Sequence, residues 1–74
     1  MKNEVGRNIR NYRKSIGMSQ RHLATKVGIS QQGLFKIEKE LVNPKVSTVV
    51  KIIEILRVTP NQLFGLDDDV GQNK

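Results

Sequence analysis

The sequence contains no cysteine, no tryptophan and a single histidine, His22. Without thiols the chain forms no disulfide and offers no thiolate to a metal, which fits a reducing compartment. One histidine leaves little for zinc ligation or for histidine-based catalysis. No apolar run approaches the roughly 20 residues of a membrane span, and the polar N-terminus lacks the apolar stretch of a signal peptide. These absences predict a cytoplasmic protein without a metal, a cofactor or a membrane association.

Features of an enzyme are also lacking. The chain has no glycine-rich loop for phosphate and no pairing of a nucleophile with a base. Asp67, Asp68 and Asp69 form a dense carboxylate run, but they lack the spacing and the terminal glutamate of a calcium loop. The sequence therefore predicts a protein that is not an enzyme, and no small-molecule ligand is evident from it.

Acidic residues are few, with 7 against 13 basic residues and a net charge of +6. Removing residues 67–74 leaves 12 basic and 4 acidic side chains, a net charge of +8 on the rest. Such an excess favours a nucleic-acid partner, the alternative being a soluble protein with a basic pI. The chain is short enough for one domain, expected over residues 1–66, followed by an acidic tail over 67–74 that is expected to be disordered.

Amphipathic segments separated by short breaks predict an all-α protein of five helices. In the first segment Val5, Ile9, Tyr12 and Ile16 recur at helical spacing, and Gly17 ends the helix.

The second and third helices begin at two closely spaced start signals. Ser19 is the expected N-cap of a helix that stops at Gly28, and Ser30 is the N-cap of a helix running to about Lys39. A glycine turn joins the two helices, which predicts a sharp angle between them.

Residues 46–56 allow two interpretations. Their β-branched content would suit a strand, whereas apolar residues at 46, 49, 50, 53 and 56 suit a helix that follows Pro44. A helix is preferred because no partner strand exists elsewhere. That apolar stripe is expected to be buried, with Ile55 on the opposite side. Thr59 as N-cap and Pro60 at the first position predict a short fifth helix.

The third helix has one apolar and one polar side. Leu34 and Ile37 occupy the first, and two amides, two cations and an aromatic ring occupy the other: Gln31, Gln32, Phe35, Lys36 and Lys39. Glutamine can pair with adenine, lysine with guanine or phosphate, and an aromatic ring can contact a thymine methyl group. The alternative is an ordinary polar surface with one stray aromatic residue.

The pattern as a whole resembles the helix-turn-helix of the phage repressor and Cro family, also called the Xre-type regulators. The resemblance spans about residues 6–66 and rests on Ser19-Gln20, Leu23-Ala24, Gly28-Ile29-Ser30, Ile37-Glu38, Asn43-Pro44 and the segment Thr59 to Phe64. It implies a compact five-helix bundle of the lambda repressor-like type, with the second and third helices forming the helix-turn-helix. It also implies a transcriptional regulator, a repressor, whose third helix enters the major groove of double-stranded DNA.

The resemblance assigns roles position by position. The base-reading positions match Gln31, Gln32, Phe35 and Lys36. The positions that contact the DNA backbone match Gln20, Arg21, Ser30, Lys39, Asn43 and Lys45. Arg13 and Glu38 match a partly buried ion pair. The chain departs from the family at Glu40 and Arg57, where glycine is usual, and at Leu41 and Val42, where polar residues are common.

One recognition helix reads only a few base pairs, so we expect a homodimer on a palindromic operator. Ile55, Phe64 and Leu66 are apolar residues expected on the surface, and they form the predicted dimer interface. The alternative is an antitoxin or another protein-binding module of the same fold, which would meet a protein partner through Leu41 and Val42. A dimer of the isolated chain would favour the first interpretation and a monomer the second.

Overall fold

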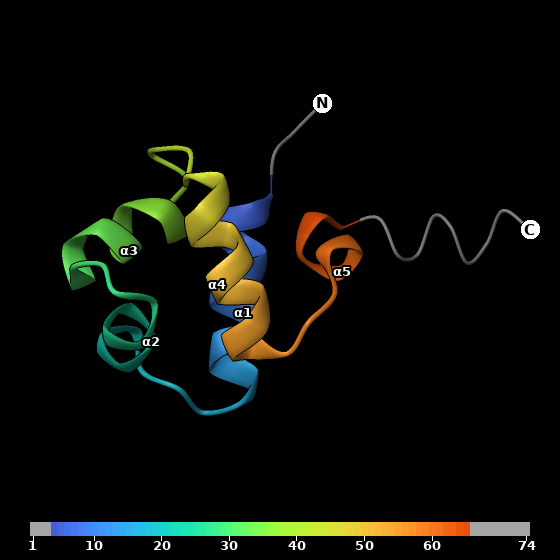
Figure 1. Ribbon diagram of the computed structural model, residues 1–74, viewed down its shortest axis with the longest axis horizontal. Coiled ribbons are helices and arrows are strands. Elements are labelled where there is room, and N and C mark those ends of the chain that lie inside the picture. The colour runs from blue at the N-terminus through green and yellow to red at the C-terminus, as the bar shows by residue number, and fades with distance from the viewer. Residues whose placement is uncertain (1–3, 66–74) are drawn as a thin grey trace, which may run out of the picture.

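The computed structural model describes residues 4–65, which form five helices (Figure 1). They are α1 (Val5–Ser15), α2 (Gln20–Val27), α3 (Gln31–Glu38), α4 (Val46–Leu56) and α5 (Pro60–Phe64). The predicted all-α fold is confirmed, and residues 46–56 are helical rather than extended. Within residues 4–65, none of the helices has the length and apolar character needed to cross a membrane.

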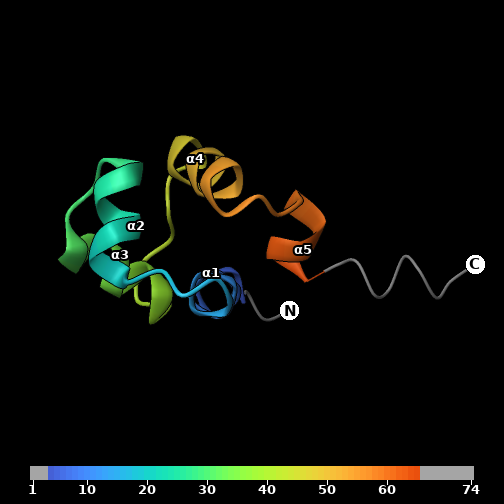
Figure 2. The ribbon, with the colours of Figure 1, turned by 90° about the horizontal axis from the view of Figure 1, so that it is seen from below.

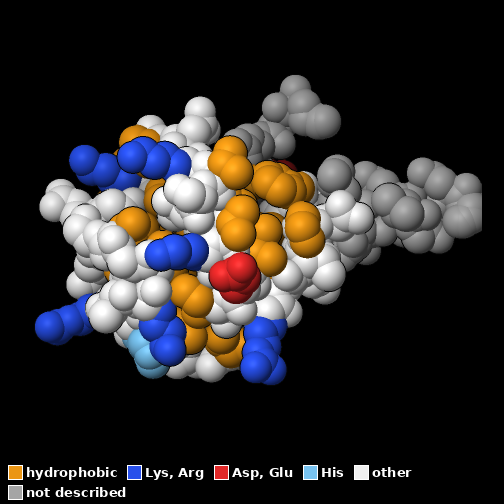
Figure 3. All heavy atoms as spheres, viewed as in Figure 1, with side chains coloured by type: hydrophobic (Ala, Val, Ile, Leu, Met, Phe, Trp, Pro, Cys, Tyr) orange, Lys and Arg blue, Asp and Glu red, His pale blue; other side chains and the backbone are white. Residues whose placement is uncertain are grey.

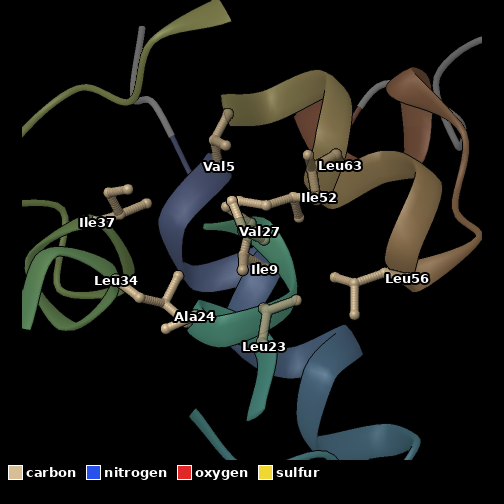
Figure 4. Close-up of a cluster of buried hydrophobic side chains, with 10 residues drawn as sticks. All are labelled: Val5, Ile9, Leu23, Ala24, Val27, Leu34, Ile37, Ile52, Leu56 and Leu63. Carbon is tan, nitrogen blue, oxygen red and sulfur yellow. The ribbon is translucent and has the colours of Figure 1, made fainter. Parts of the chain in front are cut away.

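The helices surround one core, with α1 and α4 stacked at the centre of the molecule. Helices α2 and α3 lie on one side of this pair and α5 lies on the other (Figures 1 and 2). Helix α1 packs against α3, α4 and α5, and α2 packs against α3 and α4. The side chains that fill the space between them are Val5, Ile9, Leu23, Ala24, Val27, Leu34, Ile37, Ile52, Leu56 and Leu63 (Figure 4).

Three of the helices begin where the sequence predicts. The hydroxyl groups of Ser19 and Ser30 each accept a hydrogen bond of 2.9 Å from the backbone N–H three residues later. Thr59 accepts a bond of 3.0 Å from the Gln62 N–H, and the Gln62 side chain accepts one of 2.8 Å from the Thr59 N–H. Each cap contributes about 1 kcal/mol and satisfies a donor that the helix leaves open.

The two departures from glycine keep the backbone conformation that glycine would suit. Glu40 has φ 64° and Arg57 has φ 60°, both in the left-handed region. Holding a side chain there costs about 1–2 kcal/mol. At Glu40 a new contact offsets part of that cost, because its carboxylate accepts a 3.1 Å hydrogen bond from the backbone N–H of Arg7 in the first turn of α1.

The apolar stripe predicted for α4 is wrong in part. Ile52 and Leu56 are the buried residues of this helix, whereas Val46 is 79% exposed and Val50 is 47% exposed. Ile55, expected on the open side, is half-buried and packs against the core. Apolar residues surround most of this helix, so its sequence does not specify which side turns inward. The packing against α1 and α2 selects it.

Other expectations for apolar residues have mixed outcomes. Ile16, predicted to continue the buried side of the first helix, follows the end of α1 and is 54% exposed. Leu34 and Ile37 of α3 are buried, as expected. Leu66, the end of the predicted domain and the acidic tail over 67–74 lie outside the described residues.

Candidate nucleic-acid interface

The polar side of α3 lies on the surface of the molecule. Burial of Leu34 and Ile37 on the inner side leaves Gln31, Gln32 and Lys36 exposed, and Phe35 is 43% exposed. The two α3 glutamines and the ring line a hollow of about 430 Å³ together with Gln20 from the start of α2. The structure therefore brings hydrogen-bonding amides from two helices to one place.

A second hollow, of about 280 Å³, lies next to the first and shares Phe35 and Gln20 with it. It is lined by Arg10, Arg13, Gln20, Phe35, Glu38 and Lys39. Arg10, exposed on α1, was not among the predicted site residues. The sequence feature that could have indicated Arg10 is its position one turn before Arg13 on α1. This spacing places the two guanidinium groups on neighbouring parts of the helix surface.

A buried network of hydrogen bonds fixes α2 and α3 relative to α1. Arg13 donates from Nε to Glu38 Oε2 at 2.8 Å and from Nη2 to Glu38 Oε1 at 3.0 Å. Its third nitrogen, Nη1, donates to the carbonyl oxygen of Met18 at 2.7 Å. The side chain of Glu38 is 1% exposed and that of Arg13 is 9% exposed. The structure thus brings Arg13 and Glu38 together in a bidentate pair, the strongest geometry for these two groups.

Gln20 belongs to this network as well as to the surface. Its Nε2 donates to Glu38 Oε1 at 3.1 Å, so the side chain connects the start of α2 to the end of α3. The first backbone N–H groups of α2, including those of Gln20 and Arg21, have no acceptor within the helix. Together with the helix dipole they can bind an anionic group such as a phosphate.

The remaining predicted backbone contacts are spread over the ends of α3. The hydroxyl of Ser30 is engaged as the N-cap of the helix. The ammonium group of Lys39 lies 5.8 Å from the centroid of the Phe35 ring, within range of a cation–π interaction. Asn43 and Lys45 are exposed in the connection between α3 and α4, and neither lines the two hollows.

The charges of this surface are mostly positive. Of the four acidic residues within positions 1–66, Glu38 is neutralised in the buried pair, and the carboxylate of Glu40 is bound to the start of α1. Arg10, Lys36 and Lys39 remain exposed on or beside α3. Such a surface attracts a polyanion and carries hydrogen-bonding groups suited to base edges.

Comparisons with known proteins identify the family and the fold to which this chain is similar. A family model described as helix-turn-helix matches residues 9–63. An HTH-type transcriptional regulator of Archaeoglobus fulgidus is 34% identical over 61 residues, which are 82% of this chain and 87% of the relative. The crystal structure of SinR, a master regulator for biofilm formation, in complex with DNA superposes with a TM-score of 0.74 at 35% identity, over 80% of this chain and 95% of that one.

The fold alone also matches a phage protein at lower identity. The P22 c2 repressor, solved with a synthetic operator, has a TM-score of 0.79 and 24% identity, over 89% of this chain and all of that one. The fold and the exposed face of α3 define a helix-turn-helix domain, a class of DNA-binding regulators rather than enzymes. The chain belongs to the helix-turn-helix family and is a transcriptional regulator of the Cro/C1 repressor type.

Proposed function

We propose that the protein represses transcription by binding a specific site on double-stranded DNA, with α3 in the major groove and α2 across the backbone. The observation that carries this proposal is the exposed face of α3, which combines amides, cations and a ring without an acid. In this arrangement Gln31, Gln32, Phe35 and Lys36 meet base edges. The backbone contacts come from Gln20, Arg21, Ser30, Lys39, Asn43 and Lys45.

The protein is further proposed to act as a homodimer on a palindromic operator. An apolar groove of about 240 Å³ supports this, lined by Val5, Asn43, Pro44, Val46, Val49, Val50 and Phe64. Phe64 is 47% exposed, and hydrophobic side chains gather on the face formed by α4 and α5 (Figure 3). The proposed dimer interface therefore consists of Val46, Val50 and Phe64, and it no longer includes Ile55, which is half-buried. Two copies meeting here would bring two recognition helices to half-sites about one turn apart.

Binding is expected to weaken steeply as salt is raised. Each phosphate neutralised by lysine or arginine releases counterions and contributes about −0.9 to the slope of log K against log salt. With roughly three or four such contacts in each subunit, a dimer is expected to show a slope on the order of −5 to −7. Titration of a fluorescent duplex at several salt concentrations measures the slope, and a flat response contradicts DNA binding through this face.

Two variants are expected to distinguish a residue that reads a base from one that contacts the DNA backbone. Gln32→Ala should weaken binding to the best operator by about 1–3 kcal/mol and relax the preference at one base pair, with little change in non-specific binding. Gln20→Ala should weaken binding to every operator variant by a similar factor, because its side chain fixes α2 against Glu38 and is proposed to contact the DNA backbone rather than a base. Selection of sites from random DNA compares the two. A Gln32→Ala variant that selects the parental consensus with parental affinity would show that α3 is not the reader.

The dimer is tested by a charge placed in the groove. Val50→Asp should convert a dimer into a monomer, because pairing would desolvate the carboxylate against apolar side chains. Ser47→Asp, on the exposed part of the same helix outside the groove, is the matched control and should leave the mass unchanged. Light scattering or sedimentation at several concentrations gives the mass of each variant.

A second candidate function has its own support. Leu41 is 66% exposed and Val42 is 46% exposed, and a hollow lined by Val42, Asn43 and Pro44 adjoins the groove. This surface could meet a different protein, as in an antitoxin that binds its toxin. If the parental chain is a monomer at micromolar concentration, the homodimer is wrong and this second function is favoured.

A further inference from the structure

The ring of Phe35 is the one apolar group on the reading face of α3. It is 43% exposed and is absent from the cluster of apolar side chains that forms the core. Like Gln20, it lines both hollows: Gln31 and Gln32 complete the first, and the cations of Arg10 and Lys39 are among the residues of the second. Packing within the described residues thus gives no reason for an aromatic residue at this position.

An aromatic ring that contacts base edges contributes favourable binding free energy only where it meets an apolar group. In the major groove the 5-methyl group of thymine is the apolar feature, since the other edge positions are hydrogen-bond donors and acceptors. A ring placed against those polar atoms would remove water from them without replacing its hydrogen bonds. The modified base 5-methylcytosine carries the same methyl group on the same ring atom.

We propose that Phe35 reads the 5-methyl group of a pyrimidine, so that the chain requires thymine, or accepts 5-methylcytosine, at one position of each half-site. This inference rests on the proposed function and names the group that one side chain recognises. Lys39 places its ammonium group 5.8 Å from the ring centroid, within range of a cation–π interaction that favours this position of the ring. Gln31 and Gln32 share a hollow with the ring. In this proposal one of these glutamines therefore reads the adjoining base pair, by hydrogen bonds to its adenine.

The experiment removes the methyl group without changing any base pair. Sites are first selected from random duplexes with the parental protein, and each thymine of the best site is then replaced in turn by deoxyuridine. We expect one position in each half-site at which this change weakens binding about four-fold, the value of burying one methyl-sized group. At that position a duplex with 5-methylcytosine should bind about four-fold more tightly than the same duplex with cytosine.

Variants connect the effect to the side chain. Phe35→Ala should bind the thymine and uracil duplexes equally, and likewise the two cytosine duplexes. Phe35→Leu keeps an apolar group at the position and should retain part of each difference. Ile16→Ala is the matched control, because Ile16 is 54% exposed at the end of α1 and lines neither hollow. It should show the parental differences, and circular dichroism verifies that each variant is folded.

The outcomes separate this inference from the function on which it rests. If the protein selects a site and binds it with a steep salt dependence, yet uracil equals thymine at every position, the role of Phe35 is wrong and DNA binding stands. If the methyl effect persists in Phe35→Ala, another side chain reads the methyl group and the proposal is likewise overturned. If no sequence is enriched in the selection, the proposed function itself fails, and the inference with it.

Discussion

Glu38→Ala is expected to destabilise the domain by about 3–5 kcal/mol, because it leaves the guanidinium of Arg13 buried without its partner. The two side chains are 1% and 9% exposed and are joined by two hydrogen bonds of 2.8 and 3.0 Å. The change also removes the acceptor of Gln20. A domain of this size has a free energy of unfolding of roughly 5–10 kcal/mol, so the variant is expected to be largely unfolded on mild heating.

Urea denaturation followed by circular dichroism measures this effect. Glu54→Ala is the matched control, since Glu54 is an exposed glutamate on α4 for which the described residues provide no ion-pair partner, and its stability should be unchanged. If Glu38→Ala is too unstable to study, Glu38→Gln keeps the shape and one acceptor oxygen and should lose less. Equal stability of Glu38→Ala and the parental chain would contradict the burial described for this pair.

Replacing both members of the pair distinguishes two free energies: the cost of burying an unpaired charge, and the net contribution of the ion pair to stability. Arg13→Met combined with Glu38→Leu should recover part of the loss, because no unpaired charge remains inside. Recovery should be incomplete, since the Met18 carbonyl and the Gln20 amide lose their partners. DNA binding should stay weak in the double variant even where stability returns, because the start of α2 is no longer fixed against α3.

Gly6→Ala is expected to destabilise the domain by about 2 kcal/mol through a steric overlap between helices. A Cβ atom at this position would overlap the carbonyl oxygen of Ile37 and lie 2.9 Å from Cγ of Glu40. Alanine is a better helix former than glycine, but that gain is at most about 1 kcal/mol. Because the obstacle is backbone, α1 and α3 must move apart, and overpacking of a core costs about 1–3 kcal/mol or more.

The control for this variant is an alanine elsewhere on the same helix. Asn11→Ala, at an exposed position of α1 with no side-chain hydrogen bond among the described residues, should leave stability unchanged or raise it slightly. Thermal melts of the two variants give the comparison. If Gly6→Ala melts at the parental temperature, the close approach of α1 to the end of α3 is wrong.

Local chemistry allowed most of the helix boundaries to be predicted from the sequence. Ser19, Ser30 and Thr59 are followed by helices because each side chain accepts the N–H three residues ahead, a bond made within one turn of chain. Gly28 ends α2 with φ 89°, a conformation that glycine adopts without strain. The exposed face of α3 was also predictable, since Leu34 and Ile37 specify the buried side by helical spacing alone.

The sequence by itself thus determined the helices, the polar face of α3 and the sign of the charge. Only the tertiary structure decided which side of α4 is buried, with Ile52 and Leu56 inside and Val46 and Val50 exposed. It also decided that Glu38 accepts a hydrogen bond from the amide of Gln20. The close approach of α1 to α3 at Gly6 is the third feature of this kind. The physical reason is range. A cap or a helical stripe depends on residues within about four positions. By contrast, Gln20 and Glu38 are 18 positions apart and Gly6 and Ile37 are 31 positions apart, and the buried side of α4 depends on which neighbouring helices its apolar surface meets.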